Sequence, residues 1–106
     1  MAGDQAAFEA GIRKGDSLAW AGRWEESISQ FARAAMEFPD SVLAHTSLGM
    51  AYAHCERFAE ALAEYELVGS RLPDDLIVQR KIADMHGKLG KVDRFAEGYL
   101  LLAETL

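Results

Sequence analysis

Apolar side chains recur along the chain at intervals of three and four residues, which is the spacing of an amphipathic helix. One such series runs through Leu48, Ala51, Tyr52 and Cys55, and the next series begins at Phe58. Alanine, leucine and glutamate dominate the composition, so local preferences favour helix as well. The pattern predicts an all-α fold, with helices near residues 5–21, 24–37, 41–55, 58–71, 75–88 and 92–105.

The same classes of side chain return at an interval of 34 residues. Pro39 and Pro73 are one interval apart, and an aromatic residue recurs as Phe31, Tyr65 and Tyr99. A period of this length indicates a repeat protein in which each repeat is a pair of helices. We therefore expect a single domain over residues 1–106, divided into three repeats at about 8–41, 42–75 and 76–106.

Polar residues that can cap a helix follow the two prolines. Asp40-Ser41 comes directly after Pro39, and Asp74-Asp75 comes directly after Pro73. An oxygen-bearing side chain at such a position can accept a hydrogen bond from a free backbone N–H of the first helical turn. Proline also discourages the preceding helix from continuing. These positions therefore predict where the third and fifth helices begin.

The charge balance and the single cysteine narrow the functional classes. The 106 residues carry 11 Lys and Arg against 17 Asp and Glu, a formal net charge of −6, which disfavours binding to nucleic acids. Cys55 has no partner for an internal disulfide, and no apolar run reaches the roughly 18 residues that a membrane helix needs. The first residues lack the basic and apolar segments of a signal peptide, so we expect a cytoplasmic protein.

Nothing in the sequence has the spacing of a catalytic or cofactor motif. His45, His54 and His86 form no pair four residues apart, and none stands at a zinc-ligand spacing from Cys55. Neither a phosphate loop nor a nucleophile elbow occurs. We expect no metal, no cofactor and no enzymatic activity. Cys55 is interpreted as a packing residue, and a reactive thiol is the alternative.

The repeat resembles the tetratricopeptide repeat (TPR), whose 34-residue pattern runs W-x2-L-G-x2-Y, then A-x3-F, then P. The second unit matches the pattern best, through Leu48-Gly49, Tyr52, Ala61, Tyr65 and Pro73. The third unit departs from it at His86, where Tyr is usual, and at Phe95, where a small residue is usual. We expect Phe95 to shift the packing of the last helix pair. The resemblance covers about residues 8–106 and implies a right-handed solenoid.

The resemblance also implies that the first helix of each unit lines a concave groove in which a peptide or protein segment binds. One subgroup of the family grips the C-terminal carboxylate of chaperone tails with lysine, asparagine and arginine. This chain has no asparagine, and Asp16 would repel a carboxylate, so we do not expect that type of ligand. The family geometry places in the groove Glu9, Ile12, Arg13, Asp16, Trp20, Leu43, Thr46, Ser47, Met50, His54, Ile77, Arg80, Lys81, Asp84 and Lys88.

Charge and hydrophobicity divide the predicted groove. Its middle is apolar, its beginning carries the carboxylates Glu9 and Asp16, and its end carries three cations, Arg80, Lys81 and Lys88. We therefore hypothesise that a ligand lies with its acidic portion towards the third unit.

Three further side chains have a specific expectation. Trp20 either anchors a ligand or folds over the end of its helix. Trp24 is expected in the core. His54 faces the groove in the family geometry, where it could hydrogen-bond a ligand or respond to pH.

The end of the sequence offers a second kind of surface. Solenoids usually finish with a polar capping element, and none follows the last apolar series, which includes Tyr99, Leu100, Leu101 and Leu102. We expect either that the chain is a fragment or N-terminal module of a longer protein, or that this end forms a homodimer. The alternative function is therefore an oligomerisation or spacer module.

Overall fold

The computed structural model describes residues 3–105, so Met1, Ala2 and Leu106, which belong to the two ends discussed above, lie outside the described residues. Over residues 3–105 the chain is all-α, as predicted, and each helix begins and ends within one residue of its expected boundary. The helices are α1 (Gln5–Trp20), α2 (Trp24–Glu37), α3 (Val42–His54), α4 (Phe58–Arg71), α5 (Leu76–Lys88) and α6 (Val92–Thr105).

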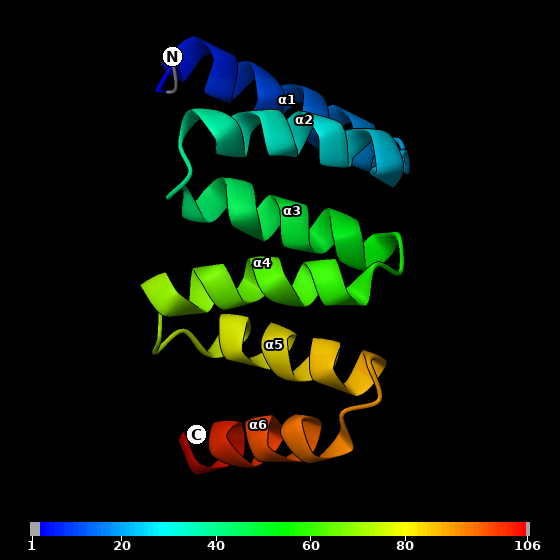
Figure 1. Ribbon diagram of the computed structural model, residues 1–106, viewed down its shortest axis with the longest axis vertical. Helices are drawn as coiled ribbons and strands as arrows, with labels where there is room; N and C mark the ends of the chain where they lie inside the picture. The colour runs from blue at the N-terminus through cyan, green and yellow to red at the C-terminus, as the bar shows by residue number, and fades with distance from the viewer. Residues whose placement is uncertain (1–2, 106) are drawn as a thin grey trace.

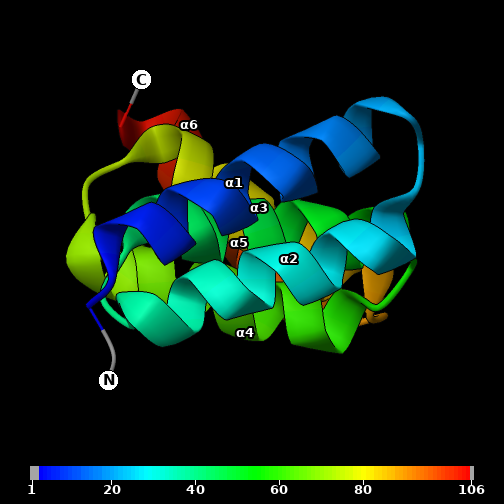
Figure 2. The ribbon, with the colours of Figure 1, turned by 90° about the horizontal axis from the view of Figure 1, so that it is seen from above.

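The helices form three antiparallel pairs that stack on one another (Figure 1). Each helix packs chiefly against the helices that precede and follow it in the chain. The stack measures 42 × 25 × 20 Å, and Figure 2 looks down it, with α1 and α2 side by side at the near end. α1, α3 and α5 are therefore the first helices of the three units, and α2, α4 and α6 are the second helices.

Two buried clusters hold neighbouring units together. Each cluster joins the second helix of one unit to the first helix of the next. The first cluster contains Ile28, Phe31, Leu48 and Ala51. The second contains Ala61, Leu62, Tyr65 and Met85. Tyr52 packs against both clusters, so the two clusters form a continuous apolar spine through the stack.

Glycines let the two helices of a unit approach one another closely. A Cβ placed on Gly15 would overlap the ring of Phe31, and a Cβ placed on Gly49 would lie 2.7 Å from Cε1 of Tyr65. Both positions are thus too close to a ring for ordinary carbon–carbon contact. The aromatic residue of each of these units fills the space that the absent side chain leaves.

The third unit packs differently, as expected from Phe95. In the other units this position holds Ser27 and Ala61, which are small and fully buried. The Phe95 ring instead lies beside Gly87, where a Cβ added to the glycine would come within 2.8 Å of Phe95 Cδ2. Tyr99 is the counterpart of the buried Phe31 and Tyr65, yet it is 37% exposed and contacts Phe95 edge-on. The shift is therefore confirmed: Phe95 takes the space beside α5, and Tyr99 moves towards solvent.

The predicted caps of α3 and α5 are confirmed. Ser41 Oγ accepts a hydrogen bond from the backbone N–H of Ala44, and Asp75 Oδ1 accepts one from the N–H of Val78, both at 3.1 Å. Each cap satisfies one of the backbone N–H groups that a helix leaves free at its first turn.

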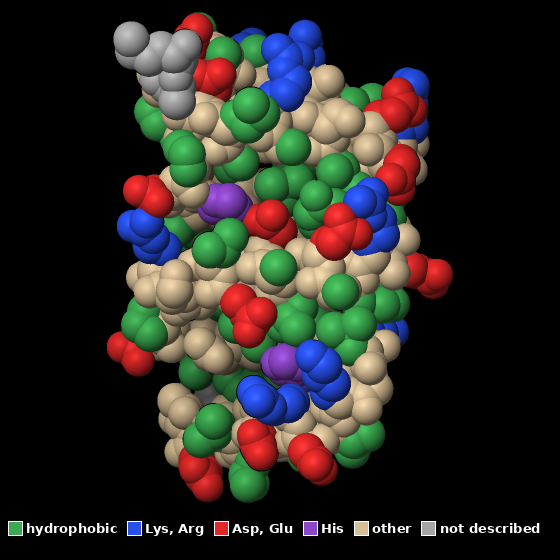
Figure 3. Space-filling model, in the orientation of Figure 1, with side chains coloured by type: hydrophobic (Ala, Val, Ile, Leu, Met, Phe, Trp, Pro, Cys, Tyr) green, Lys and Arg blue, Asp and Glu red, His purple; other side chains and the backbone are tan. Residues whose placement is uncertain are grey.

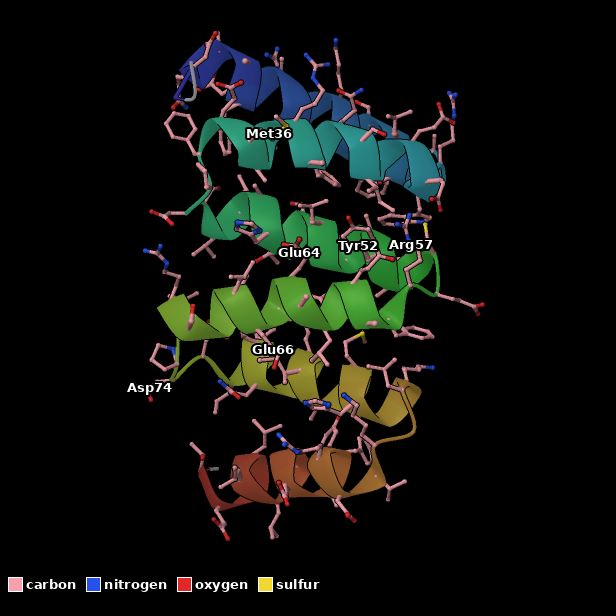
Figure 4. All side chains as sticks on the ribbon, in the orientation of Figure 1. Met36, Tyr52, Arg57, Glu64, Glu66 and Asp74 are labelled. Atoms are coloured by element: carbon pink, nitrogen blue, oxygen red, sulfur yellow. The ribbon has the colours of Figure 1, made fainter. Side chains whose placement is uncertain are left out.

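Arg57 ties the second unit to the first at the turn between α3 and α4 (Figure 4). Its Nη1 lies 2.8 Å from Glu25 Oε1 on α2, and its Nη2 lies 2.7 Å from Glu60 Oε2 on α4. The guanidinium carbon also lies 4.9 Å from the centre of the Tyr52 ring. The hydrogen bond between Arg57 and Glu60 lowers the pKa of Glu60 and raises the pKa of Arg57.

Candidate peptide-binding face

The predicted groove residues lie on the first helices of the three units, and we call the surface that they form the groove face. On α3, Leu43 and Met50 are seven residues apart, which places both side chains on the same side of the helix. Ile77 is the repeat counterpart of Leu43 on α5. All three side chains are exposed, so α3 and α5 together present apolar surface that a partner can cover.

Trp20 is the last residue of α1 and is 92% exposed. This exposure is incompatible with an indole ring folded over the end of the helix. Glu9 and Asp16 on the same helix are exposed as well. An exposed indole at the end of α1, with two exposed carboxylates further back along the same helix, is therefore the main feature of the groove face in the first unit.

His54 is held by an aromatic partner that the sequence did not indicate. Its ring stacks on Trp24, with ring centroids 3.9 Å apart and planes inclined by only 2°. Trp24 is half-buried and packs against the first cluster, as expected. The imidazole is therefore exposed but fixed in orientation, because one of its faces covers the indole.

Two residues of the predicted groove are less accessible than expected. Ser47 is only 6% exposed, and Ile12 packs against the first cluster. The counterparts of Ser47 in the other units are the long side chains of Arg13 and Lys81, which can extend from the same backbone position to solvent. A short hydroxyl cannot, so the assignment of Ser47 to a ligand-contacting surface is corrected: it packs between helices.

The three cations of the third unit differ in whether they contact an aromatic ring of α4. Arg80 is exposed. Lys81 Nζ lies 5.6 Å from the centre of the Tyr65 ring, and Lys88 Nζ lies 5.8 Å from the centre of the Phe58 ring. Both lysines therefore lean across the interface with α4, and their ammonium groups gain a cation–π contact.

Tyr99 contributes to this end of the groove face, although the sequence assigned it to the C-terminal surface. Its hydroxyl donates a hydrogen bond to Asp84 Oδ1 on α5, which raises the pKa of Tyr99. The ring thereby borders a largely apolar cleft of about 360 Å³ with Ile77 and Arg80. Two departures from the repeat accompany this placement, Phe95 and Ala83, which replaces the glycine that faces the ring in the other units. The sequence predicted a shift of packing here but not the position that Tyr99 takes.

The proposed self-association residues divide into two groups. Leu100 and Leu101 are each 63% exposed, as a surface for a partner requires. Leu102 is only 9% exposed and lines clefts beside Leu76. Leu102 is therefore corrected to a packing residue between α5 and α6, because it occupies the buried position that Val68 holds in α4.

Cys55 packs against the first cluster at the end of α3. Burial and the nearby Glu25 raise the pKa of the thiol to about 11. The thiolate is the nucleophilic form of cysteine, so only a very small fraction of this side chain is reactive near neutral pH.

Alkylation by iodoacetamide at pH 8 should therefore be about a hundredfold slower for folded Cys55 than for the same residue in the urea-unfolded chain, because the thiolate fraction falls about tenfold for each pKa unit. The rate is measured by mass spectrometry, and a free cysteine peptide in the same urea concentration corrects for the solvent. Equal rates in the folded and unfolded chains would contradict the packing role.

Residues 3–105 hold no cluster of three His, Cys, Asp or Glu side chains arranged to bind a metal ion. In the same part of the chain, no helix has both the length and the apolar character needed to cross a membrane.

The fold of this chain is similar to the folds of several solved structures. No family model matches the sequence, and no curated protein is significantly similar to it. Among solved structures, the first TPR domain of Spaghetti (RPAP3), bound to the HSP90 peptide SRMEEVD, has TM-score 0.83 and 18% identity, over 95% of this chain and 80% of that one. The Sgt2 TPR domain from Aspergillus fumigatus has TM-score 0.81 and 14% identity, over 97% and 68%.

A chain of MamA from Desulfovibrio magneticus RS-1 is similar as well, with TM-score 0.82 and 18% identity over 92% of this chain. The present chain spans 55% of the length of that MamA chain. Identities this low establish the fold alone. The six helices, their pairing and these similarities together show that the chain has the fold of a tetratricopeptide repeat domain.

Proposed function

We propose that this domain is a non-catalytic scaffold that binds a peptide or protein segment on its groove face. The observation that carries the proposal is the exposed indole of Trp20 together with the exposed Leu43, Met50 and Ile77 on the first helices. Tryptophan and methionine are effective contact residues because they cover much apolar area and adapt to a partner. The Spaghetti domain, of the same fold, is bound to a peptide, which supports this use of the architecture.

We further propose that the acidic portion of the ligand lies towards the third unit. Arg80, Lys81 and Lys88 bring three cations to α5, whereas α1 presents Glu9 and Asp16. This opposition of charge fixes the direction of a ligand more than it raises affinity. We do not propose that the ligand is a C-terminal carboxylate held by a clamp of lysine, asparagine and arginine, because Asp16 occupies one of the clamp positions.

The test is a selection of peptides from a random phage-displayed library, followed by affinity measurements with the selected peptide. The double variant Trp20→Ala and Met50→Ala should bind it at least about thirtyfold more weakly, since interface anchors of this kind contribute about 2 kcal/mol or more. The matched control is Met36→Ala with Leu67→Ala, which removes two exposed apolar side chains from second helices. Equal losses in both double variants would contradict the groove face as the binding surface.

The proposed ligand direction has its own test. Reversing the charge of Arg80 and Lys81 together to glutamate should weaken a selected peptide that carries acidic residues, and increasing salt should reduce the difference. Unchanged affinity would refute the direction without affecting the proposed surface.

A second candidate function is self-association through α6, supported by the exposure of Leu100 and Leu101. In this case the chain is an oligomerisation module, or the surface is covered by further repeats of a longer protein. Sedimentation equilibrium over a wide concentration range distinguishes a homodimer from a monomer. If the protein dimerises, replacing Leu100 and Leu101 with glutamine should restore the monomer. We propose the cytoplasm as the compartment for either function.

A further inference from the structure

The contacts between neighbouring units follow one scheme at both junctions. The last residue of a first helix lies over the aromatic ring that begins the second helix of the unit before it. His54 stacks on Trp24 at the first junction, and Lys88 Nζ lies 5.8 Å from the centre of the Phe58 ring at the second. His54 and Lys88 are repeat counterparts, and so are Trp24 and Phe58. The two outer helices of the stack each hold one half of such a contact.

These two halves are strongly exposed apolar side chains. Trp20 ends α1, in the position that His54 holds in α3, and it is 92% exposed. Val92 begins α6, in the position that Trp24 holds in α2, and it is 69% exposed. α1 and α6 lie at opposite ends of the stack (Figure 1). If a second copy continued the stack, its Trp20 would therefore lie over Val92 of the first copy.

An ion pair accompanies this contact at the first junction. Arg57 Nη1 of the second unit lies 2.8 Å from Glu25 Oε1 of the first. The second junction has Ala59 in place of Glu25, but the third unit restores a carboxylate there as Asp93. Arg23 is the counterpart of Arg57, and both Arg23 and Asp93 are exposed. A second copy that continued the stack would bring them together as Arg57 and Glu25 are.

The outward side of α6 has the apolar composition of an internal junction. The residues of α2 that belong to the first cluster or pack against it are Trp24, Ile28, Phe31, Ala32 and Ala35. Their counterparts in α6 are Val92, Ala96, Tyr99, Leu100 and Ala103, all of them exposed. We call these five residues the α6 stripe. A contiguous apolar surface of this kind marks a contact site.

Carboxylates flank the α6 stripe. Glu97 and Glu104 stand three residues before and four residues after Leu100, so all three are neighbours on the helix surface. The cations of α6, Lys91 and Arg94, border a different cleft, which α4 and α5 also line. Figure 3 shows acidic and hydrophobic side chains along the α6 end of the stack and Lys and Arg side chains projecting from the α1 end. The surface that covers α6 should therefore be partly basic.

The outward side of α1 meets this requirement. It carries a largely apolar cleft of about 580 Å³ lined by Ala10, Arg13, Lys14, Ser17, Leu18 and Gln30. Among the described residues that line it there are two cations and no carboxylate. Lys14 stands where α3 has Leu48, and its aliphatic stem can cover apolar surface while the ammonium group reaches a carboxylate. A junction made with α1 is thus more polar than the internal ones, so the association is reversible.

We propose that copies of this chain stack head to tail, with α1 of one copy covering the α6 stripe of the next. The proposal rests on the second candidate function and names the surface that receives α6. Trp20 lies over Val92, Arg23 pairs with Asp93, and the cleft on α1 receives the middle of the stripe. Because the two contacting surfaces differ, the contact does not close on itself, and each added copy leaves a surface for another.

The test is sedimentation velocity over a wide concentration range with two blocked variants. Trp20→Glu with Arg23→Glu places negative charge on the α1 surface, and Val92→Lys with Leu100→Lys places positive charge on the α6 stripe. All four side chains are exposed, so the fold should persist, as circular dichroism can check. The original chain should form species larger than a dimer, and each variant alone should stay monomeric. Their equimolar mixture should form a dimer that grows no further, because each variant keeps one free surface.

The control is Met36→Lys with Leu67→Lys, which adds the same charge at two exposed apolar positions of second helices outside both surfaces. It should assemble as the original chain does. Assembly that stops at a dimer and survives the α1 substitutions would overturn the head-to-tail arrangement but leave self-association through α6 intact. An original chain that stays monomeric at every concentration would overturn both. A mixture of the two variants that stays monomeric would also refute the pairing of α1 with α6.

Discussion

Replacing Phe31 with alanine should lower the free energy of unfolding by about 3–5 kcal/mol, the usual cost of removing a fully buried phenyl ring. Phe31 has no exposed surface, belongs to the first cluster and fills the space beside Gly15. The variant loses both the burial of the ring and the contacts of the walls that surround it. Urea denaturation followed by circular dichroism measures the change.

The repeat provides a matched control for this prediction. Tyr99 occupies the same position in the third unit but is 37% exposed. Tyr99→Ala should therefore cost less, about 1–2 kcal/mol, since more than a third of the residue is already in solvent and the hydrogen bond to Asp84 is at the surface. If the two substitutions destabilise equally, the different packing of the third unit is refuted.

Replacing Gly15 with alanine should destabilise the chain by about 1–3 kcal/mol, even though alanine is the better helix former. The new methyl group would overlap the ring of Phe31, and that ring is fully enclosed and cannot move aside without displacing its neighbours. The overlap therefore outweighs the gain of about 1 kcal/mol in helix propensity. The same urea denaturation measures the difference.

Gly69 is the control for the glycine substitution, because it also lies within a helix but has more room. A Cβ at Gly69 would approach the terminal Cδ1 of Ile82 at 3.1 Å, and this flexible end can shift. Gly69→Ala should therefore be close to neutral or slightly stabilising. Combining Gly15→Ala with Phe31→Leu should cost less than the sum of the single changes if the two sites share one space. Strict additivity would argue against direct contact.

The sequence predicts the local part of this structure well. Helix ends follow from neighbouring residues alone, since Pro39 stops α2 and Ser41 caps α3. The repeat interval also identified Phe31 and Tyr65 as equivalent core residues, because the same packing is repeated from unit to unit. Both inferences need no knowledge of how far one unit is rotated against the next.

The candidate site was less predictable, because it depends on distances between helices. A repeat position specifies where a backbone lies, but the length of each side chain decides what reaches solvent. Ser47 is buried for this reason, although its longer counterparts are not. The stacking of His54 on Trp24 joins two units and has no signature in the sequence around either residue. The burial of Leu102 does follow from the repeat, because Val68 holds the same position one unit earlier and is buried.

The packing of each helix against its chain neighbours also bears on how this molecule folds. Such a topology has a low contact order, so no long loop must close before native contacts form, and folding is correspondingly fast. Stability is then a sum of unit and interface contributions rather than the property of one indivisible core. The helix at either end is held by fewer neighbours than those inside, and it can detach while the rest stays folded. A partner that binds across several units would couple them, and would gain part of its influence by suppressing this fraying.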